Sequence, residues 1–363
     1  MIDSETKAKL RHLLSGKTRK RTIMQKYLHI PKIIECPICR TNSAHLLWRT
    51  SSKQAAQHFV LQEKHPERFL ELVSHIERLW GQNACEVVQC DKCGFCYSNP
   101  FIAGDQQFYN FAYVSFGYPE WKWEFQKTYD VLKKCFVSDA KFLEIGAGDG
   151  AFIRKIAEGI ISKENILCTE FSEYGRHQLE KFGVRCLSED VRSIINAELE
   201  GTIDIVCMFQ VLEHMDRLDV LFNKLNWLTK RGSSIFIAVP NQIRIEFNEL
   251  NGALLDMPPN HIGRYNKRCF EEIGRQYGFH IKDYQVEKSN FIFTAKEFII
   301  YRLLRRSQKS GSFENQILKT RNRNLLRIMQ MIGVVVNSII AIPALTKVNS
   351  GVGNSQWVHF IKA

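Results

Sequence analysis

The sequence lacks the marks of several large protein classes. No internal repeat stands out over its 363 residues, and no secretory leader is evident at Met1-Ile2-Asp3-Ser4-Glu5. The 11 cysteines are an odd number. An odd count without a leader argues against a disulfide framework and in favour of a reducing compartment. We therefore expect a cytoplasmic protein.

Two nucleotide-binding patterns are also absent from the glycine-rich stretch at 146–150. Its spacing is neither the Gly-x-Gly-x-x-Gly of nicotinamide binders nor a P-loop, because no Gly-Lys-Ser/Thr follows. Instead, the apolar run Phe142-Leu143-Glu144-Ile145 precedes glycines at alternate positions, and a helical pattern opens at Ala151. Glycines let the backbone approach a ligand closely, and the next helix points its first amides at the bound group. The pattern predicts a parallel strand whose carboxyl end meets a nucleotide-like cofactor.

This stretch resembles motif I of class I S-adenosylmethionine (SAM) methyltransferases, in which an acid lies two residues before the first glycine. Predicted strands follow in order at 165–170, 184–187, 203–209 and 234–241. The resemblance implies an α/β fold, a Rossmann-like seven-stranded SAM methyltransferase sheet. It also implies that the sheet closes on an antiparallel pair, which we expect at about 281–286 and 353–361.

Glu170 ends the second predicted strand, 20 residues after Gly150. An ionised carboxylate there can accept both ribose hydroxyls, because it takes two hydrogen bonds at once. It can equally cap the following helix, since acids stabilise helix N-termini. The resemblance adds Asp190, which in this family meets the adenine amino group. The cofactor-binding residues that we infer are Glu144, Gly146, Gly148, Gly150, Glu170, Asp190, Val191, Phe209 and Gln210.

Two Cys-x-x-Cys knuckles stand apart from the other cysteines, at 36–39 and 90–93. Paired knuckles can place four thiolates tetrahedrally around one ion, and zinc prefers such a closed sulfur shell. Cys96 lies near enough to compete as a ligand, and a redox Cys-x-x-Cys is the weaker alternative. The 50 residues between the knuckles should hold a helical insertion, with His58 on its apolar face. We predict a structural zinc held by Cys36, Cys39, Cys90 and Cys93.

The second knuckle and its continuation, Cys90 to Pro100, resemble methyltransferases that carry an N-terminal zinc-binding module. Such enzymes are common in sugar-modification and cell-surface polysaccharide pathways, and some are sugar C-methyltransferases. We therefore expect a basic segment at 1–34 and a zinc-binding module with a helical insertion at 35–105. A SAM methyltransferase domain should follow at 106–363, with its own helical insertion at 295–347.

Methyl transfer to oxygen or carbon requires removal of the acceptor's proton, ideally by a group that titrates near neutrality. Glu213 and His214 are adjacent and follow the strand predicted at 203–209. His261 follows Pro258-Pro259-Asn260, and two prolines stiffen that loop. The resembled enzymes often have Pro-Pro-x-His near the acceptor. We predict His261 as the base, with His214 or Glu213 as alternatives, and a helix without a chemical role from Arg264 to Tyr277.

The net charge of +12 lies outside the predicted catalytic body. Residues 1–34 hold nine Lys/Arg and two acids, and residues 300–327 hold eight and one, which leaves 12 − 14, or −2, for the remainder. Nucleic acid is therefore not the favoured partner of the catalytic body. The apolar stretch 328–342 is interrupted by polar residues and closed by Pro343. We expect a soluble helical insertion that covers the acceptor or forms a homodimer, with peripheral membrane contact as an alternative.

Three classes of function remain open from the sequence. The leading one is a SAM-dependent methyltransferase that acts on a sugar or related small polar metabolite, with a nucleotide-linked sugar included. RNA methylation is an alternative, because some RNA methyltransferases also carry a four-cysteine module. Against it, no Asn-Pro-Pro-Tyr type motif is found. The third class is a non-catalytic SAM-fold binding protein.

Overall fold

Seven strands of the part of the chain that is described form one mixed sheet, in the order β10-β11-β8-β7-β4-β5-β6. Strands β4 to β8 run parallel, and β11 is antiparallel to both β8 and β10. The predicted α/β class and its seven-stranded sheet are confirmed. The strands are β4 (Phe142–Ile145), β5 (Ile166–Thr169), β6 (Arg185–Leu187), β7 (Ile203–Phe209), β8 (Thr229–Pro240), β10 (Phe279–Val286) and β11 (Ser355–Lys362).

The computed structural model describes residues 35–112, 121–135, 138–250, 253, 255–289, 291–307, 309–345 and 353–363. All of these residues belong to one unit, Ile34–Ala363. The basic segment expected at 1–34 lies outside the described residues.

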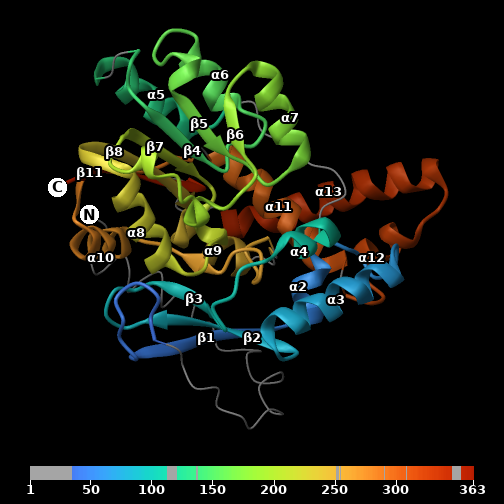
Figure 1. Cartoon of the computed structure of the whole chain (residues 1–363). Coiled ribbons are helices and arrows are strands. Elements are labelled where there is room, and N and C mark those ends of the chain that lie inside the picture. Colours follow the sequence, from blue (N-terminus) through green and yellow to red (C-terminus); the bar gives the residue numbers. More distant parts are fainter. Residues whose placement is uncertain are drawn as a thin grey trace. The chain divides into compact units, whose positions relative to one another are not determined.

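Helices cover both faces of the seven-stranded sheet (Figure 1). Alternate side chains of a strand point to opposite faces, so Leu143 belongs to one buried cluster and Phe142 to the other. Because both faces are covered, the central strands are mostly apolar, as expected for parallel strands, and Glu144 of β4 and Asp204 of β7 are exceptions. One face packs on α5 (Trp123–Cys135), α6 (Ala151–Ala157) and α7 (Glu173–Phe182), and the other on α8 (Leu218–Leu228) and α10 (Lys267–Tyr277).

A second sheet of four strands carries the cysteine knuckles, in the order β1-β2-β3-β9. Strands β1 (Ala44–Ser51), β2 (Ala84–Cys90) and β3 (Cys96–Asn99) are consecutive, but β9 (Gly263–Arg264) comes from the methyltransferase part of the chain. The predicted helical insertion consists of α2 (Ser52–Gln57) and α3 (Pro66–Trp80), which pack with α4 (Gln106–Ala112) around a separate buried cluster. His58 lies at the C-terminal end of α2 rather than on a long helical face.

The C-terminal insertion consists of three helices. They are α11 (Phe291–Ser307), α12 (Phe313–Lys319) and α13 (Arg323–Leu345). Glu314 joins them, because it accepts from Arg306 at 2.7 Å and from Asn337 at 2.8 Å. Arg244 of α9 (Gln242–Leu250) forms an ion pair with Glu297 of α11. Among the described residues, we find no helix with the length and apolar character to cross a bilayer.

His359 offers a test of the closing strand. Its ring stacks on Phe236 at 4.2 Å between centroids, and its Nε2 lies 3.0 Å from Ser234 Oγ. Burial lowers the pKa of His359 from 6.5 to about 4. Because this pKa is depressed in the folded state, the associated stability is present above the unfolded pKa of 6.5. It is lost as the pH falls towards the folded value.

We expect His359→Gln to remove this pH dependence, which amounts to on the order of 3 kcal/mol of unfolding free energy between pH 7 and pH 4. Denaturant unfolding of both proteins at the two pH values measures it. His280→Gln, at an exposed histidine of β10, is the control and should follow the wild type. An unchanged pH dependence in His359→Gln would contradict the assignment.

Candidate active site and four-cysteine cluster

The glycine bend after β4 needs glycine for two physical reasons. Gly146, Gly148 and Gly150 have φ angles of 71°, 59° and 85°, in the left-handed region that other residues rarely adopt. A Cβ on Gly146 would also lie 2.5 Å from Val211 Cγ2, and one on Gly150 would lie 2.5 Å from Leu179 Cδ2. The bend is therefore packed between the segment after β7 and helix α7.

The bend lies where the strand order of the sheet reverses. From β4 the chain proceeds outward to β5 and β6, then returns to β7 on the other side of β4. Connections at the carboxyl ends of β4 and β7 therefore diverge, and ligands of open α/β sheets bind in the crevice that this leaves. The predicted cofactor residues Gly146, Phe209 and Gln210 all lie at these two strand ends.

Glu170 is bound by backbone amides on both sides. Its Oε2 accepts from the Gly148 N–H at 2.8 Å, and its Oε1 accepts from the Ser172 N–H at 2.7 Å. The cap of α7 is Ser172, whose hydroxyl accepts from the Gly175 N–H at 3.0 Å. Glu170 is thus not needed as the helix cap. The two amides instead fix its carboxylate beside the glycine bend.

Glu144 is the most deeply buried acid of the bend, with 2 % of its surface exposed. Its Oε2 has no hydrogen-bond partner among the described residues. Burial raises the pKa of Glu144 well above its ordinary value, and the nearby Glu170 and Asp149 add to the rise, while Lys122 opposes it. A buried acceptor without a donor is costly. A cationic group bound at the bend would satisfy it, and SAM carries both an ammonium and a sulfonium.

Asp190 lies in the connection after β6 and caps the short helix that begins at the buried Val191. Burial raises the pKa of Asp190, but hydrogen bonds and charge from Arg192 outweigh this and hold it below the ordinary value. Arg192 also binds Asp216, at 3.0 Å from its Oδ1. Asp190 is therefore an ionised, oriented acceptor.

Gln210 is held in a strained conformation at the end of β7. Its φ of 59° is unusual for a residue other than glycine, and such strain is found at functional sites. Its Nε2 donates to Glu124 Oε1 and to Ser355 Oγ, both at 3.0 Å. The preceding Phe209 packs edge-on against Phe125 and Phe152. Helix α5 and strand β11 thus fix this side of the bend.

The three candidate bases converge in one cluster, in which Glu213 and His261 are buried and His214 is half-buried. Glu213 and His214 lie in a short helix (Leu212–His214) that follows Val211, the residue in contact with the glycine bend. One potential ligand atom from each of Glu213, His214 and His261 lies within 4.8 Å of the others. The two imidazole rings meet edge to face, 4.6 Å apart. The fold therefore joins residues that are 47 positions apart in the sequence, 214 and 261.

Each histidine of the cluster is oriented through its Nδ1. His261 Nδ1 lies 2.7 Å from Asp256 Oδ1, and His214 Nδ1 lies 2.7 Å from the Asn260 carbonyl oxygen and 3.0 Å from Tyr109 Oη. A carbonyl oxygen can only accept, so His214 Nδ1 must carry the proton. An ionised Asp256 likewise accepts from His261 Nδ1–H. The Nε2 of neutral His214 and neutral His261 is then left with a lone pair.

The protein environment gives the three groups different pKa values. Burial lowers the pKa of His214 to about 3, so this ring stays neutral. Burial also raises the pKa of Glu213 to about 7. For His261, burial opposes the charged form, but the hydrogen bond and charge of Asp256 outweigh it and raise the pKa above 6.5. His261 and Glu213 are therefore the better proton acceptors.

The sequence interpretation did not identify the residues that support His261. Arg264 was expected to begin a helix, but it lies in β9, and α10 begins only at Lys267. Its guanidinium donates to both carboxylate oxygens of Glu249, at 2.9 and 2.6 Å, and to the Asp256 carbonyl at 2.9 Å. A strand of two residues, Gly263-Arg264, is too short to show periodicity in the sequence. It forms only because it pairs with β3. One feature of the sequence could have indicated the partner of His261: the acid Asp256 lies five residues before it.

The cysteine-bearing sheet holds the loop that carries His261. The Ser98 N–H of β3 donates to the Ile262 carbonyl at 2.9 Å, and the Ile262 N–H donates to the Glu213 carbonyl at 2.9 Å. The Gly104 N–H donates to the Pro259 carbonyl at 3.0 Å. The loop is therefore fixed between the knuckle sheet and the segment after β7.

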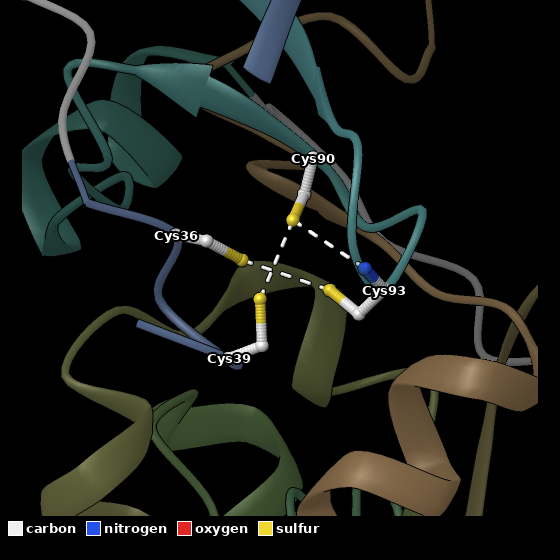
Figure 2. A group of neighbouring side chains, drawn as sticks. All are labelled: Cys36, Cys39, Cys90 and Cys93. Atoms are coloured by element: carbon white, nitrogen blue, oxygen red, sulfur yellow. Dashed lines mark hydrogen bonds between the residues drawn. The ribbon is translucent and has the colours of Figure 1, made fainter. Parts of the chain in front are cut away.

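The four predicted cysteines meet at one point. Figure 2 shows their sulfur atoms directed towards a common centre, with Cys36 Sγ 3.7 Å from Cys93 Sγ and Cys39 Sγ 3.4 Å from Cys90 Sγ. A disulfide would require about 2.05 Å. Tetrahedral sulfur ligands about 2.3 Å from zinc lie roughly 3.8 Å apart. The observed separations thus fit a closed four-thiolate metal shell better than a redox pair.

Cys96 does not join this cluster. Its Sγ accepts from Gln242 Nε2 at 3.0 Å, and burial raises the pKa of its thiol to about 12. The knuckles are docked on α10 instead: Asn266 Nδ2 donates to the Gly94 carbonyl at 2.8 Å, and Gln276 Nε2 donates to the Ile38 carbonyl at 2.7 Å. The cluster thus lies at a junction between the two parts of the chain.

Comparison with known proteins identifies a methyltransferase domain in the part of the chain that carries the glycine bend. Residues 121–283 match the family model described as a methyltransferase domain. The prediction that the chain is a SAM-dependent methyltransferase is confirmed. No curated protein matches the sequence.

Solved structures of similar fold include phosphoethanolamine N-methyltransferase 2 of Haemonchus contortus, in complex with SAM. It is 17 % identical, with a TM-score of 0.38, over 65 % of this chain and 52 % of that one. This chain therefore spans about half the length of the Haemonchus protein. Geranyl diphosphate C-methyltransferase of Streptomyces coelicolor A3(2) is 10 % identical, with a TM-score of 0.39, over 66 % of this chain and 78 % of that one.

A substitution in the bend tests its packing. Gly146→Ala combines a left-handed φ with a Cβ 2.5 Å from Val211, whereas Gly183→Ala has a φ of 89° with no atom within 4 Å of its Cβ. We expect Gly183→Ala to cost about 1 kcal/mol of unfolding free energy. Gly146→Ala should cost about 1–3 kcal/mol more because of the clash. Denaturant unfolding measures both, and equal costs would show that the bend is not tightly packed.

Proposed function

We propose that this enzyme transfers the methyl group of SAM to a sugar or related small polar metabolite, nucleotide-linked sugars included, in cell-surface polysaccharide or secondary metabolism. The observation that carries the proposal is the polar cluster of buried Glu213, His261 and Asp256 with half-buried His214. Glu213 follows Val211, which contacts the glycine bend, by two residues. A buried environment of carboxylates and imidazoles suits an acceptor rich in hydroxyl groups, because such groups can pair with it.

The donor would lie across the ends of β4 and β7. Glu170, oriented by two amides, would accept the ribose hydroxyls, and Asp190 would accept from the adenine amino group. Glu144 would face the positive charge of the methionine part. The bend at Gly146, Gly148 and Gly150 would let the backbone approach the ligand closely, as the absence of Cβ atoms allows. Val191, Phe209 and Gln210 would complete the cofactor-binding set.

His261 would take the acceptor's proton through its Nε2. Asp256 fixes the Nδ1–H tautomer, as the acid of an Asp–His pair does in other enzymes. The methyl group then passes from the sulfonium to the acceptor, and the electrons of the broken carbon–sulfur bond remain on sulfur. Since the sulfonium is already an excellent leaving group, the remaining work is alignment of acceptor and methyl.

The four-cysteine cluster would hold a structural zinc ion. Its sulfur geometry fits a closed shell that leaves no open position for substrate. Bound zinc would tie the first knuckle to the second and so stabilise the sheet that supports the His261 loop. Burial raises the pKa of the Cys39 thiol to about 11, so the ion must displace its proton on binding.

The C-terminal helices would supply an interaction surface. Helix α13 exposes apolar side chains, and basic residues lie on α11 and at the start of α13. A peripheral contact with an anionic membrane, or a homodimer, would cover them. A cytoplasmic location is part of this proposal. The exposed apolar residues are Leu325, Ile328, Met331, Ile332, Val334, Val335, Val336 and Ile339.

Donor binding is the first test of the proposal. In calorimetry, S-adenosylhomocysteine should bind the wild type, and Glu170→Ala should weaken binding by about 10- to 100-fold, because hydrogen bonds to a charged group are lost. Glu173→Ala, at an exposed acid in the first turn of α7, is the control.

A transfer assay with labelled SAM then tests the class of acceptor, by measuring whether labelled methyl passes to nucleotide sugars or to RNA. Binding without any transfer would favour a non-catalytic protein.

Metal content tests the zinc assignment. We expect Cys39→Ser to lose the ion bound by the knuckles and to unfold at a lower denaturant concentration, because structural zinc contributes directly to folding. Cys135→Ser, at an exposed cysteine of α5, should keep both the ion and the stability. Elemental analysis of the purified proteins measures the ion. Zinc-free wild-type protein that is fully folded would contradict a structural role.

A further inference from the structure

The cluster beside the glycine bend has the chemical make-up of a metal site. Glu213, His214 and His261 each offer one ligand atom, and these atoms lie within 4.8 Å of one another. An ion about 2.1 Å from each would need them roughly 3.4 Å apart. Inward movements of about an ångström by flexible side chains would close the site. Two imidazoles and one carboxylate form a donor set that suits divalent transition metals.

The hydrogen bonds around the cluster leave the metal-binding lone pairs available. Asp256 and the Asn260 carbonyl accept from the Nδ1 of His261 and of His214, so the Nε2 of each neutral ring carries a lone pair. Metal-bound histidines in proteins commonly donate their second ring nitrogen to a carboxylate or a backbone carbonyl. Both kinds of partner are present here.

Glu213 gives an independent indication of a missing ligand. Only 1 % of its surface is exposed, and its Oε2 has no hydrogen-bond partner among the described residues. Leaving a buried carboxylate oxygen unpaired costs free energy, so a partner is expected. A cation bound between the two histidines would pair with this oxygen.

We propose that Glu213, His214 and His261 bind a divalent transition-metal ion, such as Zn²⁺ or Mn²⁺, in the acceptor region of the enzyme. Three protein ligands leave coordination positions open, which distinguishes this site from the closed four-cysteine shell. The inference rests on the proposed function in one respect, the acceptor's position beside the cluster.

The ion would change how the acceptor is activated. A hydroxyl of the acceptor that takes an open position has its pKa lowered by the cation and releases its proton to water. Its oxygen then attacks the methyl carbon, and the carbon–sulfur electrons remain on the departing thioether. One lone pair on His261 Nε2 cannot both bind an ion and accept a proton. His261 therefore accepts the proton only in the metal-free enzyme, and in the metal-bound enzyme the cation activates the hydroxyl in its place.

Metal stoichiometry of the full chain tests the proposal without reference to activity. Protein purified with added Zn²⁺ should hold one ion more than the knuckles bind, and Glu213→Gln and His261→Gln should each lose one ion and keep the other. Glu173→Gln and His177→Gln, at exposed residues of α7, are matched controls and should keep both ions. A Glu213→Gln protein that retains the wild-type metal content would overturn the proposal.

Cobalt titration of the wild type keeps the test valid if a variant does not fold. Co²⁺ at the knuckles should give sulfur-to-metal charge-transfer absorption, and a second equivalent should bind with weaker bands of nitrogen and oxygen ligands only. Binding of a single equivalent, at the knuckles, would refute the second site. If a second equivalent binds but S-adenosylhomocysteine does not, the proposed function fails and the metal site stands. If the protein binds only one equivalent of Co²⁺ but binds the donor and transfers methyl, the metal site fails and the proposed function stands.

Discussion

The reversal of strand order between β4 and β7 is the constraint on which the site depends. Two parallel strands whose connections leave in opposite directions open a crevice at their carboxyl ends. The backbone can enter that crevice only if it turns sharply, and Val211 and Leu179 leave no room there for Cβ atoms. The glycines, the amide-bound Glu170 and the buried Glu144 follow from this arrangement. So does the position of Glu213 and His214, because they continue directly from β7.

The cysteine knuckles act on the same site from a distance. Their sheet borrows β9 from the methyltransferase part of the chain, and backbone hydrogen bonds from Ser98 and Gly104 fix the loop that carries His261. Asn266 and Gln276 of α10 bind the knuckle carbonyls in return. A tetrahedral ion in the knuckles would therefore stabilise the loop that carries His261 through a short, hydrogen-bonded path. Such an ion would give the N-terminal part a physical role beyond its own folding.

The polar cluster around Glu213 and His261 is costly to build. It collects carboxylates, imidazoles and a guanidinium away from water, and buried charges stabilise a fold only when they are paired and hydrogen-bonded. Arg264 and Glu249 satisfy each other, and Asp256 satisfies His261, yet one oxygen of Glu213 has no partner among the described residues. Native proteins leave few buried polar atoms unpaired, and ordered water, a bound ion or a catalytic role accounts for such atoms. The deficit thus marks the place where chemistry is expected.

The sequence by itself determined the α/β class, the glycine bend and the pairing of the two knuckles, because these depend on local pattern and on short, fixed spacing. Periodicity could also place β7 and β8, which are long apolar runs. The partners of His261 required the tertiary structure: Asp256, Arg264 and Glu249 come together through a loop and a two-residue strand that have no periodic signal. Cys96 likewise lies outside the sulfur cluster because, in the folded chain, its side chain contacts Gln242. Local pattern encodes how a segment bends, whereas contacts between distant segments depend on packing that only the folded chain provides.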